Sequence, residues 1–246
     1  MLTPYYEQDG ITIYHGDCRG VLSALAGECD VTFDVLITDP PYGIEGGSGG
    51  DARDFKKGNY ASGSAWVDDE EYIRTVCAPA IEELLQVVER AAVTSGLRHM
   101  WLYPRPDDIG CFWTPAAATH GPWGFTTFQP VLYYGRDFRA GKGAWPTGRL
   151  LTEAAEKNGH PCPKPIGGWT WLLLKVARQS DVIIDPFAGS GTTLVAAKRN
   201  GRKAIGIEIE ERYCEIAAKR LEQGALPLEM GATVGAVDPQ LGLITE

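Results

Sequence analysis

The stretch VIIDPFAGSGTT, from Val182 to Thr193, decides the fold class of this 246-residue chain. Its first part belongs to an apolar run, Asp181 to Ile184, that is typical of a strand covered on both faces. A turn containing Gly189 and Gly191 follows, and residues Ser190 to Asn200 predict a helix. The two glycines have no side chain, so a ligand can approach the backbone of this turn closely.

The segments around this unit alternate between strand and helix patterns. Strands are predicted at Ile11–Tyr14, Asp34–Thr38, Ala91–Thr94, His99–Tyr103, Pro130–Tyr134 and Lys203–Ile209. Helices are predicted at Arg19–Ala26, Asp68–Arg90, Lys164–Arg178 and Glu211–Glu222, and Pro79 must kink or split the second of them. Such alternation predicts an α/β fold with a mostly parallel sheet flanked by helices.

An acidic residue, Glu208, lies seventeen residues beyond Gly191, at the end of the next predicted strand. A carboxylate at this place in an α/β fold can accept both hydroxyl groups of a ribose, which favours an adenosine-containing ligand. The dinucleotide fingerprint G-x-G-x-x-G is incomplete, because Leu194 stands at its third glycine. The alternative interpretation is a tight strand-to-helix turn that binds nothing.

A second motif, Asp39-Pro40-Pro41-Tyr42, follows another predicted strand. Ligands of open α/β sheets collect at the carboxyl ends of the strands, so this motif is expected beside the glycine turn. There the Asp39 carboxylate and the Pro40 carbonyl could accept the two N–H groups of an exocyclic amine on a nucleobase. These contacts would localise the nitrogen lone pair towards a methyl donor, while Tyr42 stacks on the base. The alternative interpretation is a Pro-Pro turn with a buried tyrosine.

In this order the two motifs resemble those of amino-group DNA methyltransferases of the β arrangement, in which DPPY precedes F-x-G-x-G. The resemblance extends from Ile11 to about Arg220. It implies a Rossmann-like, S-adenosylmethionine-dependent methyltransferase fold with a circularly permuted motif order. It also implies that the target base of DNA is flipped out of the duplex to reach the pocket.

The resemblance further implies which residues form the site, with catalysis at Asp39, Pro40, Pro41 and Tyr42. Contacts to S-adenosylmethionine would come from Asp17, Asp39, Lys164, Asp185, Phe187, Gly189, Gly191, Thr192 and Glu208. Asp17 matches an acid that contacts the adenine amino group of the cofactor. Lys164 belongs to a segment, His160–Pro165, similar to one near the methionine end of the cofactor. The stretch Phe128–Tyr134 resembles one that lines the target-base pocket, with Tyr133 or Tyr134 as its wall; packing of these tyrosines in the core is the alternative.

Residues 1–223 are expected to form a single methyltransferase domain, followed by a loosely ordered tail, 224–246. A glycine-rich segment, 43–65, predicts a lid, and a short segment, 135–159, predicts a DNA-recognition insert. The insert suits a short recognition site, or one read with help from the lid, the loop 104–126 or the second subunit of a homodimer. Core or lid packing, rather than contact with bases, is expected for three tryptophans: Trp66, Trp101 and Trp113.

The composition narrows the class of protein. The net charge of −9 argues against a surface that is basic throughout, although residues 135–165 carry six basic and three acidic side chains. Six scattered cysteines predict reduced thiols and no metal site. No segment is apolar enough to span a bilayer and the first residues lack a secretory pattern, so a cytoplasmic protein of a bacterium or phage, with DNA and no membrane as partner, is expected.

The choice of target base rests on the resemblance. DPPY is commoner among the adenine enzymes of the family, whereas cytosine enzymes more often carry serine in place of Asp39. We therefore expect N6 methylation of adenine, with N4 methylation of cytosine as the alternative. A non-catalytic DNA-binding relative and a nicotinamide oxidoreductase are the other hypotheses, and restriction–modification, phage self-protection and regulatory methylation all stay open.

Overall fold

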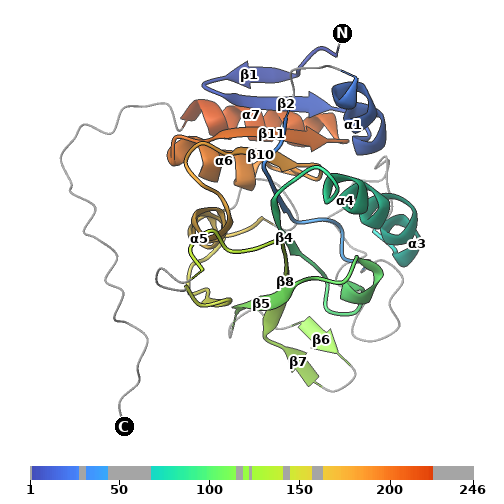
Figure 1. The fold of residues 1–246 in the computed structure, drawn as a ribbon, viewed down its shortest axis with the longest axis vertical. Helices are drawn as coiled ribbons and strands as arrows, with labels where there is room; N and C mark the ends of the chain where they lie inside the picture. Colours follow the sequence, from blue (N-terminus) through green and yellow to red (C-terminus); the bar gives the residue numbers. More distant parts are fainter. Residues whose placement is uncertain are drawn as a thin grey trace, which may run out of the picture.

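The computed structural model describes residues 2–27, 32–43, 68–114, 119–121, 124–140, 145–156 and 163–223. One sheet runs through this part of the chain in the order β1-β2-β11-β10-β3-β4-β8-β5-β9 (Figure 1). Its strands are β1 Tyr6–Gln8, β2 Ile11–His15, β3 Val35–Thr38, β4 Arg90–Thr94, β5 Asp108–Trp113, β8 Phe128–Tyr134, β9 Arg149–Leu150, β10 Val182–Asp185 and β11 Lys203–Glu208. A separate hairpin pairs β6, Thr119–Gly121, with β7, Gly124–Thr126.

The middle of the sheet is parallel and contains the topological switch point of the fold. Strand β10 pairs in parallel with β3, which places Ile184 beside Leu36, and β11, β2 and β4 continue the parallel order outward. The chain leaves β10 towards β11 but leaves β3 towards β4, so the two crossovers run to opposite sides. Ligands bind in the crevice that this divergence opens beyond the carboxyl ends of the strands.

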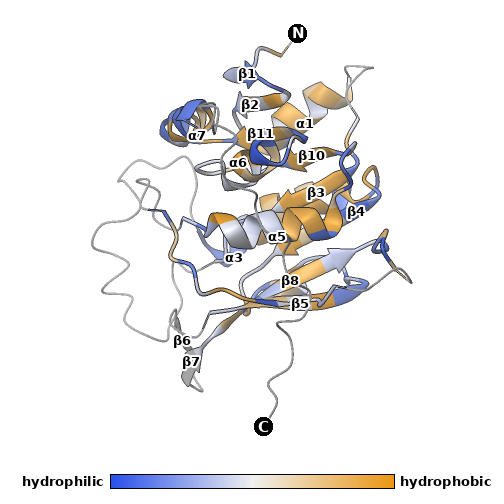
Figure 2. Cartoon of the chain, turned by 90° about the vertical axis from the view of Figure 1, so that its left-hand side faces the viewer, coloured by the Kyte–Doolittle hydropathy of each residue, from blue (hydrophilic) through white to orange (hydrophobic). Residues whose placement is uncertain are grey.

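Helices cover both faces of the sheet. Helices α5 Ile166–Val176, α6 Thr192–Arg199 and α7 Glu211–Gln223 pack on one face, while α1 Cys18–Ala26, the π-helix η1 Ile73–Cys77 and α4 Ala78–Leu84 pack on the other. Along β3, Val35 and Ile37 face the first layer and Leu36 faces the second, and all three are fully buried. Burial on both faces explains the continuous apolar runs, and Figure 2 shows the inner strands as the hydrophobic part of the molecule.

The structure corrects two predicted elements. The helix predicted at 68–90 is divided into α3 Glu70–Tyr72, η1 and α4, and ends at Leu84 rather than Arg90, which begins β4. The helical backbone continues from η1 into α4, and Pro79, which has no N–H to donate, lies just after the π-helical turn. The segment predicted as a strand at 99–103 forms instead a 3₁₀ helix, η2 Met100–Leu102, because the antiparallel strand β8 already pairs with the free edge of β4.

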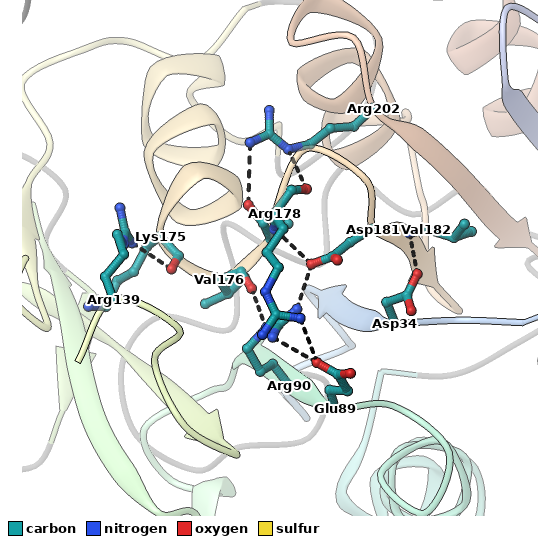
Figure 3. A network of polar contacts seen from close by, with 11 residues as sticks. Asp34, Glu89, Arg90, Arg139, Lys175, Val176, Arg178, Asp181, Val182 and Arg202 are labelled. Carbon is teal, nitrogen blue, oxygen red and sulfur yellow. Dashed lines mark hydrogen bonds and ion pairs between the residues drawn. The ribbon is translucent and has the colours of Figure 1, made fainter. Parts of the chain in front are cut away.

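A buried polar network holds the amino ends of the central strands together, on the opposite edge from the crevice (Figure 3). Arg90, at the start of β4, donates from Nη2 to Asp181 Oδ2 at 2.5 Å and from Nε to the Val176 carbonyl at 2.8 Å. Asp181 also accepts the Arg178 amide at 2.7 Å. Arg90 Nη1 also pairs with the exposed Glu89 carboxylate at 2.9 Å, but Asp181 is its buried partner, and both Arg90 and Asp181 are 4% exposed.

Among the described residues, no helix has the length and apolar character needed to cross a membrane.

Candidate active site

The two sequence motifs meet at one cavity of about 130 Å³. Pro40, Pro41 and Tyr42 follow the carboxyl end of β3, and Phe187 and Gly189 follow the carboxyl end of the neighbouring strand β10. The lining consists of Gly16, Cys18, Asp39, Pro40, Pro41, Tyr42, Asp68, Tyr72, Lys164, Pro186, Phe187, Gly189, Ile207, Glu208, Ile209 and Tyr213. Asp39 and Gly189 therefore border a single space, as expected, although 150 residues separate them in the chain.

The Asp39 carboxylate is held by side chains from four different segments. Its Oδ2 forms an ion pair with Lys164 Nζ at 2.8 Å. Its Oδ1 accepts hydrogen bonds from Thr94 Oγ1 at 2.5 Å and from Gln129 Nε2 at 3.2 Å. The Tyr42 hydroxyl also donates to Oδ1. A carboxylate in such a position is an acceptor of fixed direction at the wall of the cavity.

Tyr42 is fixed by the turn that follows β4. His99 Nδ1 donates to the Tyr42 carbonyl at 2.7 Å, because a carbonyl oxygen can only accept. A Cβ added at Gly96 would lie 2.9 Å from Tyr42 Cβ, so this glycine permits the close approach of the two segments. Lys164 Nζ lies 2.9 Å from the Tyr42 hydroxyl and 4.6 Å from the centre of its ring. The Tyr42 ring is thus one wall of the cavity, with a cation next to it.

Glu208 lies at the carboxyl end of β11 and is 7% exposed. Its Oε2 accepts the Gly189 amide at 2.8 Å and its Oε1 accepts the Glu210 amide at 2.8 Å. Burial raises the pKa of this carboxyl to about 7, although the two amide contacts favour the ionised form. Each oxygen keeps a further lone pair, so Glu208 can still accept hydroxyl groups of a ligand in the cavity.

Asp185 ends β10 but does not line the cavity. Its Oδ1 accepts the Thr38 hydroxyl at 2.7 Å and the Phe187 amide at 3.1 Å, and the side chain is 2% exposed. Burial raises the pKa of Asp185 to about 6. This carboxyl therefore links the carboxyl ends of β3 and β10 and fixes the start of the glycine turn, although it does not itself line the cavity.

A comparison with protein families agrees with this geometry: the model of the N6/N4 DNA methylase family matches residues 94–219, just over half of the chain. The chain belongs to the N6/N4 DNA methylase family. This confirms the resemblance to amino-group DNA methyltransferases that the motifs carry.

Relatives of this DNA methylase match most of its length. The type II methyltransferase M2.LlaDCHI of Lactococcus lactis subsp. cremoris is 28% identical over 257 residues, covering 92% of this chain and 94% of that protein. The crystal structure of the M1.HpyAVI–SAM complex is similar with a TM-score of 0.61 at 20% identity, covering 86% of this chain and 99% of that one. The structure of PvuII DNA methyltransferase, cytosine-N4-specific, has a TM-score of 0.64 at 14% identity, and the match covers 94% of this chain and 91% of that one. The two solved structures confirm the expected methyltransferase fold.

Besides Asp185, three of the expected cofactor residues of this DNA methylase lie outside the cavity lining. Asp17 caps α1 through the Arg19 amide at 2.9 Å and forms an ion pair with the Arg19 guanidinium at 2.6 Å, which lowers the pKa of Asp17. Gly191 has a φ of 77°, and a Cβ there would lie 2.7 Å from Ala217 Cβ on α7. Gly191 therefore permits the close packing of the start of α6 against α7. Thr192, the first residue of α6, is buried.

For Tyr133 and Tyr134 the structure favours the alternative of core packing over a pocket wall, and it exposes two of the tryptophans. Tyr133 and Tyr134 are buried in the core, where their hydroxyls donate to the carbonyls of Thr147 at 3.0 Å and Pro104 at 2.8 Å. Trp101 and Trp113, expected in the core or the lid, are 78% and 52% exposed. Trp113 lies opposite Phe128 and Leu150 on the neighbouring strands, and these are also exposed, so the outer strands carry an apolar patch.

Other expectations fall partly or wholly outside the described residues. Trp66, nearly all of the predicted lid, residues 141–144 and 157–159 of the predicted insert, residues 160–162 of the segment His160–Pro165 and the tail 224–246 lie there. In the predicted recognition insert, Arg149 and Leu150 form the edge strand β9, and Arg139 Nη2 donates to the Lys175 carbonyl of α5 at 2.6 Å. The described part of the insert is thus anchored to the body of the protein.

Proposed function

We propose that this DNA methylase transfers a methyl group from S-adenosylmethionine to the exocyclic N6 amino group of adenine in DNA. The observation that carries the proposal is the common cavity of Asp39, Gly189 and Glu208. Aspartate rather than serine before Pro-Pro-Tyr supports adenine over cytosine as the target. The catalytic unit is proposed to be a single domain, residues 1–223.

The residues of the cavity fit S-adenosylmethionine. Glu208 is an acceptor for the ribose hydroxyls, the Gly189 backbone offers close approach without a side chain, and Phe187 supplies an apolar wall. Lys164 offers a cation to the carboxylate at the methionine end. When bound, S-adenosylmethionine supplies a methyl group activated by a positively charged sulfur.

The target amine is activated by acceptors at the end of β3. The lone pair of an exocyclic amine is delocalised into the base, so the nitrogen is a poor nucleophile. The Asp39 carboxylate and the Pro40 carbonyl accept its two N–H groups, which favours a tetrahedral nitrogen with a localised lone pair. As the nitrogen becomes positively charged, the Asp39 carboxylate stabilises that charge until one proton is released to water, which leaves the neutral methylated amine. Tyr42 holds the ring of the base by stacking.

The amine of a paired base is buried inside the duplex, so the base must leave the stack to reach this cavity. DNA with a flipped target base is therefore the proposed partner. A second copy of the chain could extend the short insert that is available for recognition.

Mass analysis of methylated nucleosides tests the proposal. The purified protein is incubated with S-adenosylmethionine and genomic DNA that lacks methylated bases, and the DNA is digested to nucleosides. N6-methyldeoxyadenosine as the product is the expected result. N4-methyldeoxycytidine alone would overturn the choice of adenine, and the absence of both products would favour a non-catalytic DNA-binding relative. Sequencing of the same DNA for modified bases then gives the recognition site.

A further inference from the structure

The two oxygens of the Asp39 carboxylate have different surroundings. Oδ1 accepts three hydrogen bonds from Thr94, Gln129 and Tyr42. Among the described residues, Oδ2 contacts one side chain, Lys164, whose Nζ lies 2.8 Å away. Because a carboxylate offers about four lone-pair sites over two oxygens, Oδ1 is fully used and Oδ2 is not.

We propose that Thr94 and Gln129 are positioning residues that anchor Oδ1 and thereby direct Oδ2 of Asp39 at the target amine. The assignment rests on the proposed function and extends it, because neither residue belongs to the DPPY motif or to the cofactor turn. Neither lines the cavity: Thr94 acts through Asp39, and Gln129 acts through Asp39 and through the Tyr42 hydroxyl, to which its Nε2 also donates.

The sheet explains why these two residues can fix the carboxylate. Thr94 is the last residue of β4, next to β3, and is fully buried. Gln129 lies on β8, the next strand, which pairs Val131 with Thr94. Groups mounted on neighbouring strands move little, so they can hold a side chain more accurately than a loop can. A second contact ties Thr94 to the end of β3, because its Oγ1 lies 3.3 Å from the Thr38 carbonyl oxygen.

The chemical need for such an anchor follows from the torsion of the aspartate side chain. Rotation of the carboxylate about its Cβ–Cγ bond has broad minima, so an unanchored Asp39 would present its lone pairs in many directions. Methyl transfer requires the amine lone pair to point at the methyl group, and misplacement by about 1 Å can cost about 100-fold in rate. The Lys164 ammonium, on a flexible stem, can share Oδ2 with the amine while Oδ1 stays fixed.

Single-turnover and steady-state kinetics of Thr94→Val and Gln129→Met test the assignment. Valine has nearly the shape of threonine without the hydroxyl, and methionine resembles glutamine without the amide. We expect kcat to fall about 10- to 100-fold in each variant, with the KM for DNA and the Kd for S-adenosylmethionine within about twofold of the wild type. Thr94→Ser keeps the hydroxyl and should recover most of kcat. Thr75→Val, at an exposed threonine on η1, is the matched control and should behave as the wild type.

The outcomes separate this inference from the proposed function. Wild-type methyl transfer establishes the activity; its absence would defeat the proposed function and the positioning role with it. With an active wild type, unchanged kcat in both variants would overturn the positioning role alone. Loss of S-adenosylmethionine binding in both variants, or failure of Thr94→Ser to recover kcat, would show a structural role and also overturn it. Because the two variants lie on different strands, a folding defect in one leaves the other as the test.

Discussion

The pH dependence of cofactor binding should report the ionisation of Glu208. The side chain is 7% exposed, and burial, aided by repulsion from Glu210 and Asp185, raises its pKa from 4.5 to about 7. Hydroxyl groups of a ribose donate to the ionised carboxylate, so the charged form is the binding form. We expect the affinity for S-adenosylmethionine to increase with pH up to about 7 and to level off above it.

The size of the expected change in affinity follows from the raised pKa of Glu208. Below the pKa the ionised fraction of Glu208 falls tenfold per pH unit, so binding at pH 6 should be about tenfold weaker than at pH 8.

The free energy of unfolding should change with pH in the opposite direction to the affinity. A carboxyl whose pKa is raised in the folded state binds its proton more tightly there than in the unfolded chain. The contribution of Glu208 to stability is therefore highest below pH 4.5 and declines up to about pH 7, by roughly 3 kcal/mol at most.

Isothermal titration of the protein with S-adenosylmethionine between pH 5.5 and 8 measures this dependence. Glu208→Gln removes the titrating group and should bind weakly at every pH, with a flat profile. Glu215→Gln changes an exposed glutamate on α7 and is the matched control, which should keep the wild-type profile. The same ligand is used throughout, so titration of its own amino group near pH 8 is common to all three proteins. An affinity that does not vary below pH 7, or a variation that persists in Glu208→Gln, would refute the reasoning.

Three further predictions concern Asp39, Gly189 and Asp181. Asp39→Ala should abolish methyl transfer while leaving the Kd for S-adenosylmethionine near normal; equal loss of both would mean that Asp39 is mainly a cofactor ligand. Gly189→Val should block cofactor binding in a titration, because its side chain fills the ligand space and its φ of 52° suits glycine, and retained binding would count against the pocket. Asp181→Ala removes the buried partner of Arg90 and leaves it only the exposed carboxylate of Glu89, 2.9 Å from Nη1, so urea denaturation should show a loss of at most about 3–5 kcal/mol; a loss below about 1 kcal/mol would contradict the importance of the buried pair.

Much of the fold could be predicted because the strands of its parallel centre are buried on both faces. The runs at Asp34–Thr38 and Asp181–Ile184 are apolar in the sequence and appear as β3 and β10 with shifts of one residue. The sequence does not predict β1, β5 and β9; β5, for example, has a mixed pattern with a glycine, two exposed apolar residues and a charged end. The segment 99–103 has the composition of a strand, but tertiary pairing of β8 with β4 leaves it no edge to join.

By itself, the sequence determined the two motifs, the strands that carry them and the edge of the sheet at which they meet, because strand periodicity and glycine turns are local properties of the chain. Only the tertiary structure decided which other residues hold the motifs in place. Thr94 and Gln129 lie 55 and 90 residues from Asp39 and carry no local mark of their role. Their contacts depend on the order β3-β4-β8, which arises when buried surfaces pack across the whole sheet, and no single segment encodes that order.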